Sequence, residues 1–241
     1  MKNFIQSIGI EVECGINREE YYELEKFAEG NSHISLGSDA SVCVEGYDYR
    51  NVEVRYWDTS LKKVKEFVKY LWKEGKIKQN ETCGNHIHLR LTDNTLLTGI
   101  FSYRTFWDAF KRQYKKTFGT KKYLSRFYNR YCIARYNPDC VIKQLRGDWG
   151  ARYRAINLTA LRAHNTIEIR LMPYAESMME HLQQIDWVYN TVNKILNKFI
   201  KKNIYSQQIR VYAEKSLERI EIQRDKIIER VDINKEVLKC A

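Results

Sequence analysis

Two histidines alternate with aliphatic residues in the stretch Cys83-Gly84-Asn85-His86-Ile87-His88-Leu89-Arg90-Leu91. Because successive side chains of a β-strand point to opposite faces, this pattern predicts a strand with both imidazoles on one face and Ile87 and Leu89 in a core. A single His-x-His strand is a weak indication of a site, since imidazoles are also ordinary hydrogen-bonding groups.

The alternation of charged and apolar residues recurs in three more stretches: Glu11-Val12-Glu13, Glu53-Val54-Arg55 and Glu168-Ile169-Arg170. Four such strands in one sheet would give it a face of carboxylates, imidazoles and guanidinium groups. Paired like charges on a half-buried strand are unfavourable unless a cation compensates them. We therefore expect a functional site on this face; the alternative for the first pair is an edge strand with solvated carboxylates.

The hydrophobic pattern along the chain predicts the order of the elements. Strands are expected at 3–13, 51–57, 84–91, 152–158 and 166–170, the last two joined as a hairpin at His164-Asn165, and helices at 18–27, 61–71, 96–118 and from 176 onward. For 241 residues this order predicts a single α+β domain, with a sheet-forming core in residues 1–175 and a helical part in residues 176–241.

The composition favours a folded protein inside the cell. Hydrophobic residues make up 44% of the chain, which is enough for a core. No apolar run approaches the length of a membrane span, and the N-terminal Met-Lys-Asn-Phe-Ile-Gln lacks the apolar stretch of a signal peptide. The six cysteines include no Cys-x-x-Cys pair, so reduced structural thiols are expected. We expect a cytoplasmic protein without membrane contact.

The net charge of +11 is concentrated in one part of the chain. Residues 104–162 hold fifteen Lys and Arg against three acids, Asp108, Asp139 and Asp148. Such a block attracts polyanions, including nucleoside triphosphates and nucleic acid. The alternative is a solvated basic face, which is the commoner meaning of charge density alone.

The acidic residues predict a divalent-metal phosphate site. Five carboxylates and an imidazole would supply ligands for about two or three Mg²⁺ or Mn²⁺ ions, which suit oxygen donors better than zinc does. The carboxylates are those of Glu11, Glu13, Asp39, Glu53 and Glu168. Arg152 and Arg170 could hold a transferring phosphoryl group through bidentate contacts. The chain has no Gly-x-x-x-x-Gly-Lys-Ser/Thr loop, so it is not a P-loop enzyme.

These residues occur in an order that resembles the amidoligases, carboxylate–amine ligases related to glutamine synthetase and glutamate–cysteine ligase. The resemblance runs from about residue 8 to residue 175, and five short motifs in order carry it. They are Gly9-Ile10-Glu11-Val12-Glu13, Asp39-Ala40-Ser41, Cys83-Gly84-Asn85-His86-Ile87-His88, Arg152-Tyr153-Arg154-Ala155-Ile156-Asn157-Leu158 and Thr166-Ile167-Glu168-Ile169-Arg170.

The resemblance implies a curved antiparallel sheet backed by helices, with ATP and Mg²⁺ or Mn²⁺ on its concave face. A substrate carboxylate would attack the γ-phosphate to give an acyl phosphate, and an amine would displace the phosphate to form an amide or isopeptide bond. The amine acceptor would be a small molecule, a peptide or a protein. Glutamine synthetase relatives form rings, so we expect a homo-oligomer, although the C-terminal helices could also pair into dimers.

The resemblance also implies roles for individual residues. Arg152 and Arg170 would be catalytic and, with His88, would contact the phosphates of ATP or the acyl phosphate. The implied metal ligands are Glu11, Glu13, Asp39, Glu53, His86 and Glu168.

Two positions depart from the family pattern. Family members usually follow the acid of the second strand with Ser-Pro, whereas Glu53 is followed by Val54-Arg55-Tyr56, which leaves Glu45 as the alternative ligand. Arg90 stands where a small residue is common. The first departure suggests an altered substrate pocket.

Three other functions remain open from the sequence. The basic block at 104–162 would suit a nucleic-acid-binding protein on a ligase-like scaffold, whose binding would weaken steeply with salt. The same carboxylates would suit a metal-dependent nuclease. The third alternative is a structural protein with an inactive site.

Overall fold

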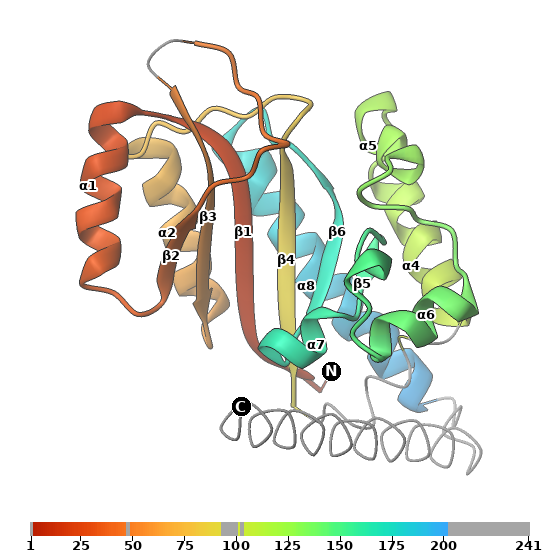
Figure 1. Cartoon of the computed structure of the whole chain (residues 1–241). Helices are drawn as coiled ribbons and strands as arrows, with labels where there is room; N and C mark the ends of the chain where they lie inside the picture. Colours follow the sequence, from red (N-terminus) through yellow and green to blue (C-terminus); the bar gives the residue numbers. More distant parts are fainter. Residues whose placement is uncertain (1, 47–48, 93–100, 102–103, 202–241) are drawn as a thin grey trace, which may run out of the picture.

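The computed structural model of the chain describes residues 2–46, 49–92, 101 and 104–201 (Figure 1). In this part the chain forms an α+β structure around a six-stranded sheet of order β2-β3-β1-β4-β6-β5, in which every neighbouring pair is antiparallel. The strands are β1 (Ile5–Asn17), β2 (Ile34–Gly37), β3 (Tyr49–Asp58), β4 (Gly84–Leu91), β5 (Ile156–Asn157) and β6 (Ile167–Pro173). The predicted class and the antiparallel sheet are confirmed.

The long strand β1 lies between β3 and β4 and aligns the charged positions of all three strands. Glu11 is paired with Arg55 on β3 and with His86 on β4, and Gly9 is paired with His88. The alternate residues Ile8, Ile10 and Val12 are buried on the other face. The period of two seen in the sequence therefore separates a charged face from an apolar one, as predicted.

Helices cover the apolar face, where α2 (Leu61–Lys73) and α8 (Met178–Lys201) lie behind the sheet in Figure 1. Ser60 is the N-cap of α2, and its hydroxyl accepts a hydrogen bond from the backbone N–H of Lys63. Its buried residues belong to the same core as Leu182, Ile185 and Val188 of α8. They are Val64, Phe67, Val68 and Leu71. Helix α1 (Arg18–Glu29) packs beside β1, β2 and β3.

The described part of the chain between β4 and β6 is mostly helical and lies beside the sheet, which it joins at β5. It contains α4 (Arg104–Thr117), α5 (Lys121–Ser125), η1 (Arg126–Tyr128), α6 (Pro138–Leu145), η2 (Trp149–Ala151) and α7 (Ala160–His164). The buried residues of α4 are aromatic, which confirms that this helix is part of the core. Of the predicted helix 96–118, residues 96–100 and 102–103 lie outside the described residues.

The predicted hairpin of 152–158 and 166–170 is wrong in its first strand and in its turn. Only Ile156–Asn157 pairs with β6, and the helix α7 stands where a tight turn was expected. The backbone N–H of Ala155 donates instead to the carbonyl of Ile133 (3.1 Å). Asn165 ends α7 in a left-handed conformation with φ of 56°.

The helical pattern predicted from residue 176 is confirmed as far as Lys201, and residues 202–241 lie outside the described part. None of the helices described combines the length and apolar character required to cross a bilayer.

Candidate metal and active site

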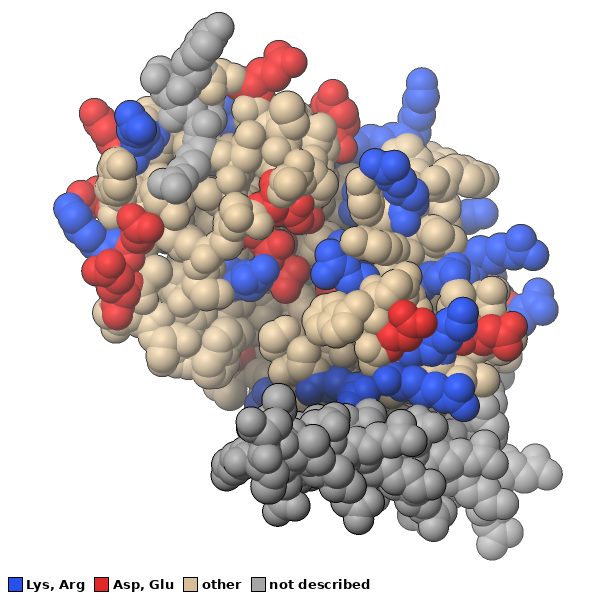
Figure 2. Space-filling model, viewed as in Figure 1, with Lys and Arg blue, Asp and Glu red and all other residues tan. Residues whose placement is uncertain are grey.

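The charged face of the sheet forms the floor of a cavity of about 880 Å³. Its walls come from β3 on one side and from η2, α7 and the segment that leads into β6 on the other. Figure 2 shows acidic side chains gathered in the middle of this face, with basic side chains beside and below them. The volume lies within the range of small-molecule binding sites.

Three side chains at the centre of the cavity have the chemistry of a metal site: Glu11, His88 and Glu168. One ligand atom from each lies within 4.8 Å of the others. His88 Nε2 is buried 3.1 Å from Glu11 Oε1 and has no hydrogen-bond partner in the part of the chain that the structure describes, whereas His88 Nδ1 is 3.0 Å from the hydroxyl of Thr166. An imidazole that is oriented through one nitrogen and leaves the other facing carboxylates is typical of a metal ligand.

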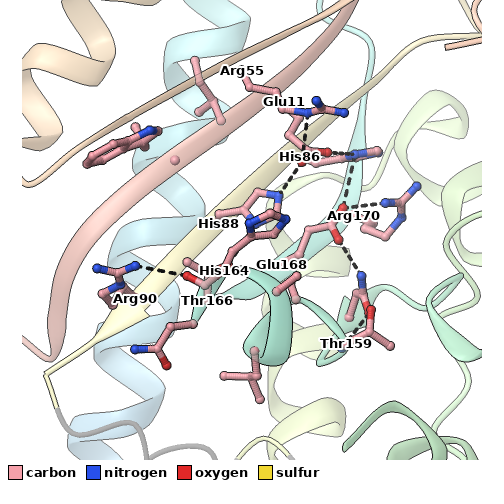
Figure 3. Close-up of a pocket in the computed structure, with 18 of the residues that line it drawn as sticks. Glu11, Arg55, His86, His88, Arg90, Thr159, His164, Thr166, Glu168 and Arg170 are labelled. Atoms are coloured by element: carbon pink, nitrogen blue, oxygen red, sulfur yellow. Dashed lines mark hydrogen bonds and ion pairs between the residues drawn. The ribbon is translucent and has the colours of Figure 1, made fainter. Parts of the chain in front are cut away.

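The second histidine of the strand lies between three carboxylates. His86 Nδ1 is 3.2 Å from Glu11 Oε2 and 3.3 Å from Glu168 Oε1, and His86 Nε2 is 3.5 Å from Glu13 Oε1. Figure 3 shows both imidazoles pointing at the acidic group. The resemblance implied His86 as the metal ligand and His88 as a phosphate contact, but these distances favour His88 as the nitrogen ligand and His86 as the link between the acids.

Glu168 is buried and has partners on both carboxylate oxygens. Arg170 Nη1 lies 2.5 Å from Oε1, and the side-chain amide of Asn157 donates to Oε2 (2.6 Å). Burial raises the pKa of Glu168, but the charges of Arg170, His88 and His86 outweigh that effect and hold the pKa below its usual range. The pKa of Glu11 is lowered further, because His88 and His86 together outweigh the burial of its carboxyl group.

Glu13 lies below the cavity rather than on its surface. Its Oε2 accepts a hydrogen bond from the backbone N–H of Gly84 (2.6 Å), and the side chain is buried and does not line the cavity. A side chain at position 84 would crowd its neighbours, since a Cβ there would lie 2.9 Å from Arg126 Nη2 and 3.1 Å from His86 Nε2. Glu13 is thus placed to hold the end of β4 and the ring of His86.

Glu53 and Asp39 line the cavity, whereas the alternative ligand Glu45 is exposed and does not. Glu53 forms an ion pair with Arg55, whose Nε also lies 3.7 Å from Glu11 Oε1. Burial and the neighbouring charge of Glu11 raise the pKa of Glu53. Asp39 is half-buried in a turn and accepts hydrogen bonds from the backbone N–H and the hydroxyl of Ser41, both at 2.7 Å.

Arg152 lines the cavity from η2 and is half-buried. Its guanidinium carbon lies 4.9 Å from the ring centre of Tyr153 and 5.9 Å from that of Trp149. No carboxylate of the described residues forms an ion pair with it, in contrast to Arg170. Arg152 is therefore available to an anionic ligand.

Three residues of the site were not among the candidates from the sequence: Arg55, Asn157 and Thr166. Arg55 belongs to the charged stretch Glu53-Val54-Arg55. The period of two places it on the charged face, but no role was assigned to it. Asn157 and Thr166 are neutral residues of two motifs that carry the resemblance, but no role was assigned to them; the structure places Asn157 beside Glu168 and Thr166 beside His88.

No protein-family model matches the chain, and a search of the curated proteins finds no match. The chemistry of the site has to be inferred from its own side chains.

Proposed function

We propose that this protein is an ATP- and Mg²⁺-dependent carboxylate–amine ligase that forms an amide or isopeptide bond through an acyl phosphate. One observation carries the proposal. Glu11, His88 and Glu168 meet at the centre of a cavity that Arg152 and Arg170 also line. The antiparallel sheet with helices on one face agrees with the glutamine synthetase-like fold that the amidoligase resemblance implies.

The residues present fit a divalent ion. Two carboxylates and one imidazole are ligands for Mg²⁺ or Mn²⁺, and none of the described residues forms a hydrogen bond with the buried Nε2 of His88. When bound, such an ion would neutralise charge on the phosphates of a nucleotide. Glu53 and Asp39, also in the cavity wall, would supply further oxygen ligands.

The two arginines have different roles in this proposal. Arg170 is fixed by Glu168 and by the carbonyl of Tyr131 (3.2 Å), so its guanidinium is held in one orientation beside the acids. Arg152 has no acidic partner among the described residues and would contact the transferring phosphoryl group. Preorganised donors of this kind stabilise the charge that develops during phosphoryl transfer.

The proposal is tested first by metal binding, because this readout does not need the true substrates. Mn²⁺ is titrated into the wild type and into Glu11→Gln and Glu168→Gln, with the free ion followed by electron paramagnetic resonance. We expect each change to weaken Mn²⁺ binding by about tenfold or more, since each removes a charged ligand. Glu23→Gln, an exposed acid of α1, is the matched control and should bind like the wild type. Equal affinities in all four proteins would contradict the metal site.

Activity is tested by incubating the protein with ATP, Mg²⁺ and pools of carboxylates and amines and measuring ADP. The expected result is ADP release that needs both a carboxylate and an amine and that is lost in the Glu11→Gln/Glu168→Gln double variant. ADP release of equal size in that variant would exclude the reaction at this site.

A second candidate is a metal-dependent nuclease or a nucleic-acid-binding protein. Trp149 and Tyr128 are exposed, and Arg130 and Arg152 lie over tyrosine rings, which is an arrangement that single-stranded nucleic acid can use. Nicking of a plasmid with Mn²⁺, or binding that weakens steeply with salt, would favour this candidate over the ligase.

A further inference from the structure

One end of the cavity is basic rather than acidic. Arg90 follows His88 by two residues on β4, so it lies on the same face at about 7 Å farther along the strand. Arg162 and His164 of α7 line this same cavity. In Figure 3, Arg90 and His164 lie on the side of the acidic centre away from Arg55.

Arg90 is held in place but has donor capacity to spare. Its Nη2 donates to the carbonyl of His164 (3.1 Å), whereas its Nε is buried and has no hydrogen-bond partner among the described residues. No carboxylate of the described chain forms an ion pair with its guanidinium group. A buried donor without an acceptor is unfavourable, and a bound anion would remove that penalty.

Arg162 is oriented in a similar way. Its Nη1 donates to the carbonyl of Arg146 (2.6 Å), and the side chain packs against Gly147. A Cβ at Gly147 would lie 2.5 Å from Arg162 Nη1, and φ of 79° also favours glycine there. The backbone thus makes room for this guanidinium group, which likewise has no acidic partner among the described residues.

Arg55 and Arg170, the other two arginines on the strands of the cavity floor, do have acidic partners. Arg55 is paired with Glu53 and Arg170 with Glu168, so their charges are largely compensated by the site itself. Arg90 and Arg162 at the α7 end, like Arg152, have no acidic partner among the described residues and keep their charge for a ligand. Arg90 also stands where a small residue is common in the amidoligases that the sequence resembles.

We propose that Arg90, Arg162 and His164 form an anion subsite that takes a carboxylate or phosphate group of the substrate beside the metal centre. This inference rests on the proposed function only in placing the reaction in the same cavity. Within the proposed ligase it specifies a substrate that carries an acidic group besides the reacting one, such as an amino acid, a peptide carboxylate or a phosphorylated amine.

The test is a binding measurement without any metal, so that it does not depend on the metal site. Pyrophosphate is titrated in one arm and tricarballylate in the other by isothermal titration calorimetry, with EDTA and at constant ionic strength. We expect saturable binding of at least one probe, and the tighter arm identifies phosphate or carboxylate as the preferred group. Arg90→Gln and Arg162→Gln should each weaken that binding by about tenfold or more, because each removes charge-assisted hydrogen bonds.

The control is Arg112→Gln, which removes the same charge from an exposed position of α4 outside the cavity. It should bind like the wild type. Absence of saturable binding in both arms, or an equal loss in Arg112→Gln, would overturn the anion subsite. Loss of Mn²⁺ affinity or of ADP release bears only on the proposed function.

Discussion

Glu168 and His181 are both almost completely buried, with exposed fractions of 4% and 1%, but Glu168 is charged in the folded state and His181 is neutral. Glu168 has a guanidinium group and two imidazoles around it and stays ionised. His181, on α8, faces the indole of Trp72, whose Nε1 donates to His181 Nδ1 (3.1 Å). Burial lowers the pKa of His181 to about 3, so it is neutral in the folded state.

His181 should make the protein less stable in mild acid. The unfolded chain binds a proton at this residue below about pH 6.5, whereas the folded chain does so only near pH 3, so stability falls as pH drops through this window. The contribution is about 1.4 kcal/mol per pH unit well inside the window. His181→Asn keeps an acceptor for Trp72 and removes the titration. Urea unfolding between pH 7 and 4.5 should show a shallower decline in the variant, and parallel declines would contradict the assignment.

At the scale of the element, β4 does most to build the site. Its alternation sends His86, His88 and Arg90 into the cavity while Ile87 and Leu89 pack in the core. The strand begins at Gly84, where a larger residue would crowd the side chains of Arg126 and His86. The cavity thus depends on the smallest residue of the strand as well as on its histidines.

Gly84→Ala should destabilise the protein by about 1–3 kcal/mol, the usual cost of overpacking. The added methyl would meet Arg126 Nη2 at 2.9 Å and press on His86. The matched control is Gly30→Ala at the end of α1, where nothing lies within 4 Å and the backbone is right-handed with φ of −88°. Its unfolding free energy should be equal to or slightly above that of the wild type. Urea denaturation of both variants measures the difference, and equal stabilities would refute the packing argument.

At the scale of the whole molecule, two parts of the chain have to keep their relative position to form the cavity. The sheet supplies its floor, whereas the helical segment after β4 supplies Arg152 and the wall around α7. Tyr114 of α4 links these parts, because its buried hydroxyl lies 2.9 Å from the carbonyl of Leu171 on β6 and 3.1 Å from that of Tyr123. The packing of this helical segment against β6 therefore depends in part on one phenol.

Tyr114→Phe should lower the unfolding free energy by about 1–2 kcal/mol, because it leaves buried carbonyls without their donor while keeping the ring. Tyr128→Phe, at a tyrosine that is 90% exposed, is the control and should be neutral. Thermal and urea unfolding of the two variants give the comparison. A loss of equal size at both positions would show that the link is not specific.

The local pattern of residues was enough to predict much of this protein. A strand repeats every two residues whatever lies next to it, so the sequence alone predicted that Glu11, His86, His88 and Glu168 would each share a face with other charged groups. The spacing of apolar residues likewise predicted the helix at 61–71, which the structure forms as α2.

The tertiary structure alone decided which of these groups meet. Glu11 and His86 are 75 residues apart, and their contact depends on the register between β1 and β4. That register also places His88, rather than His86, in the candidate metal group. Helix α7, which stands where a hairpin turn was expected, brings the backbone carbonyl of His164 to Arg90. The physical reason is that strand periodicity is a property of neighbouring residues, whereas strand pairing is set by hydrogen bonds and burial between distant segments.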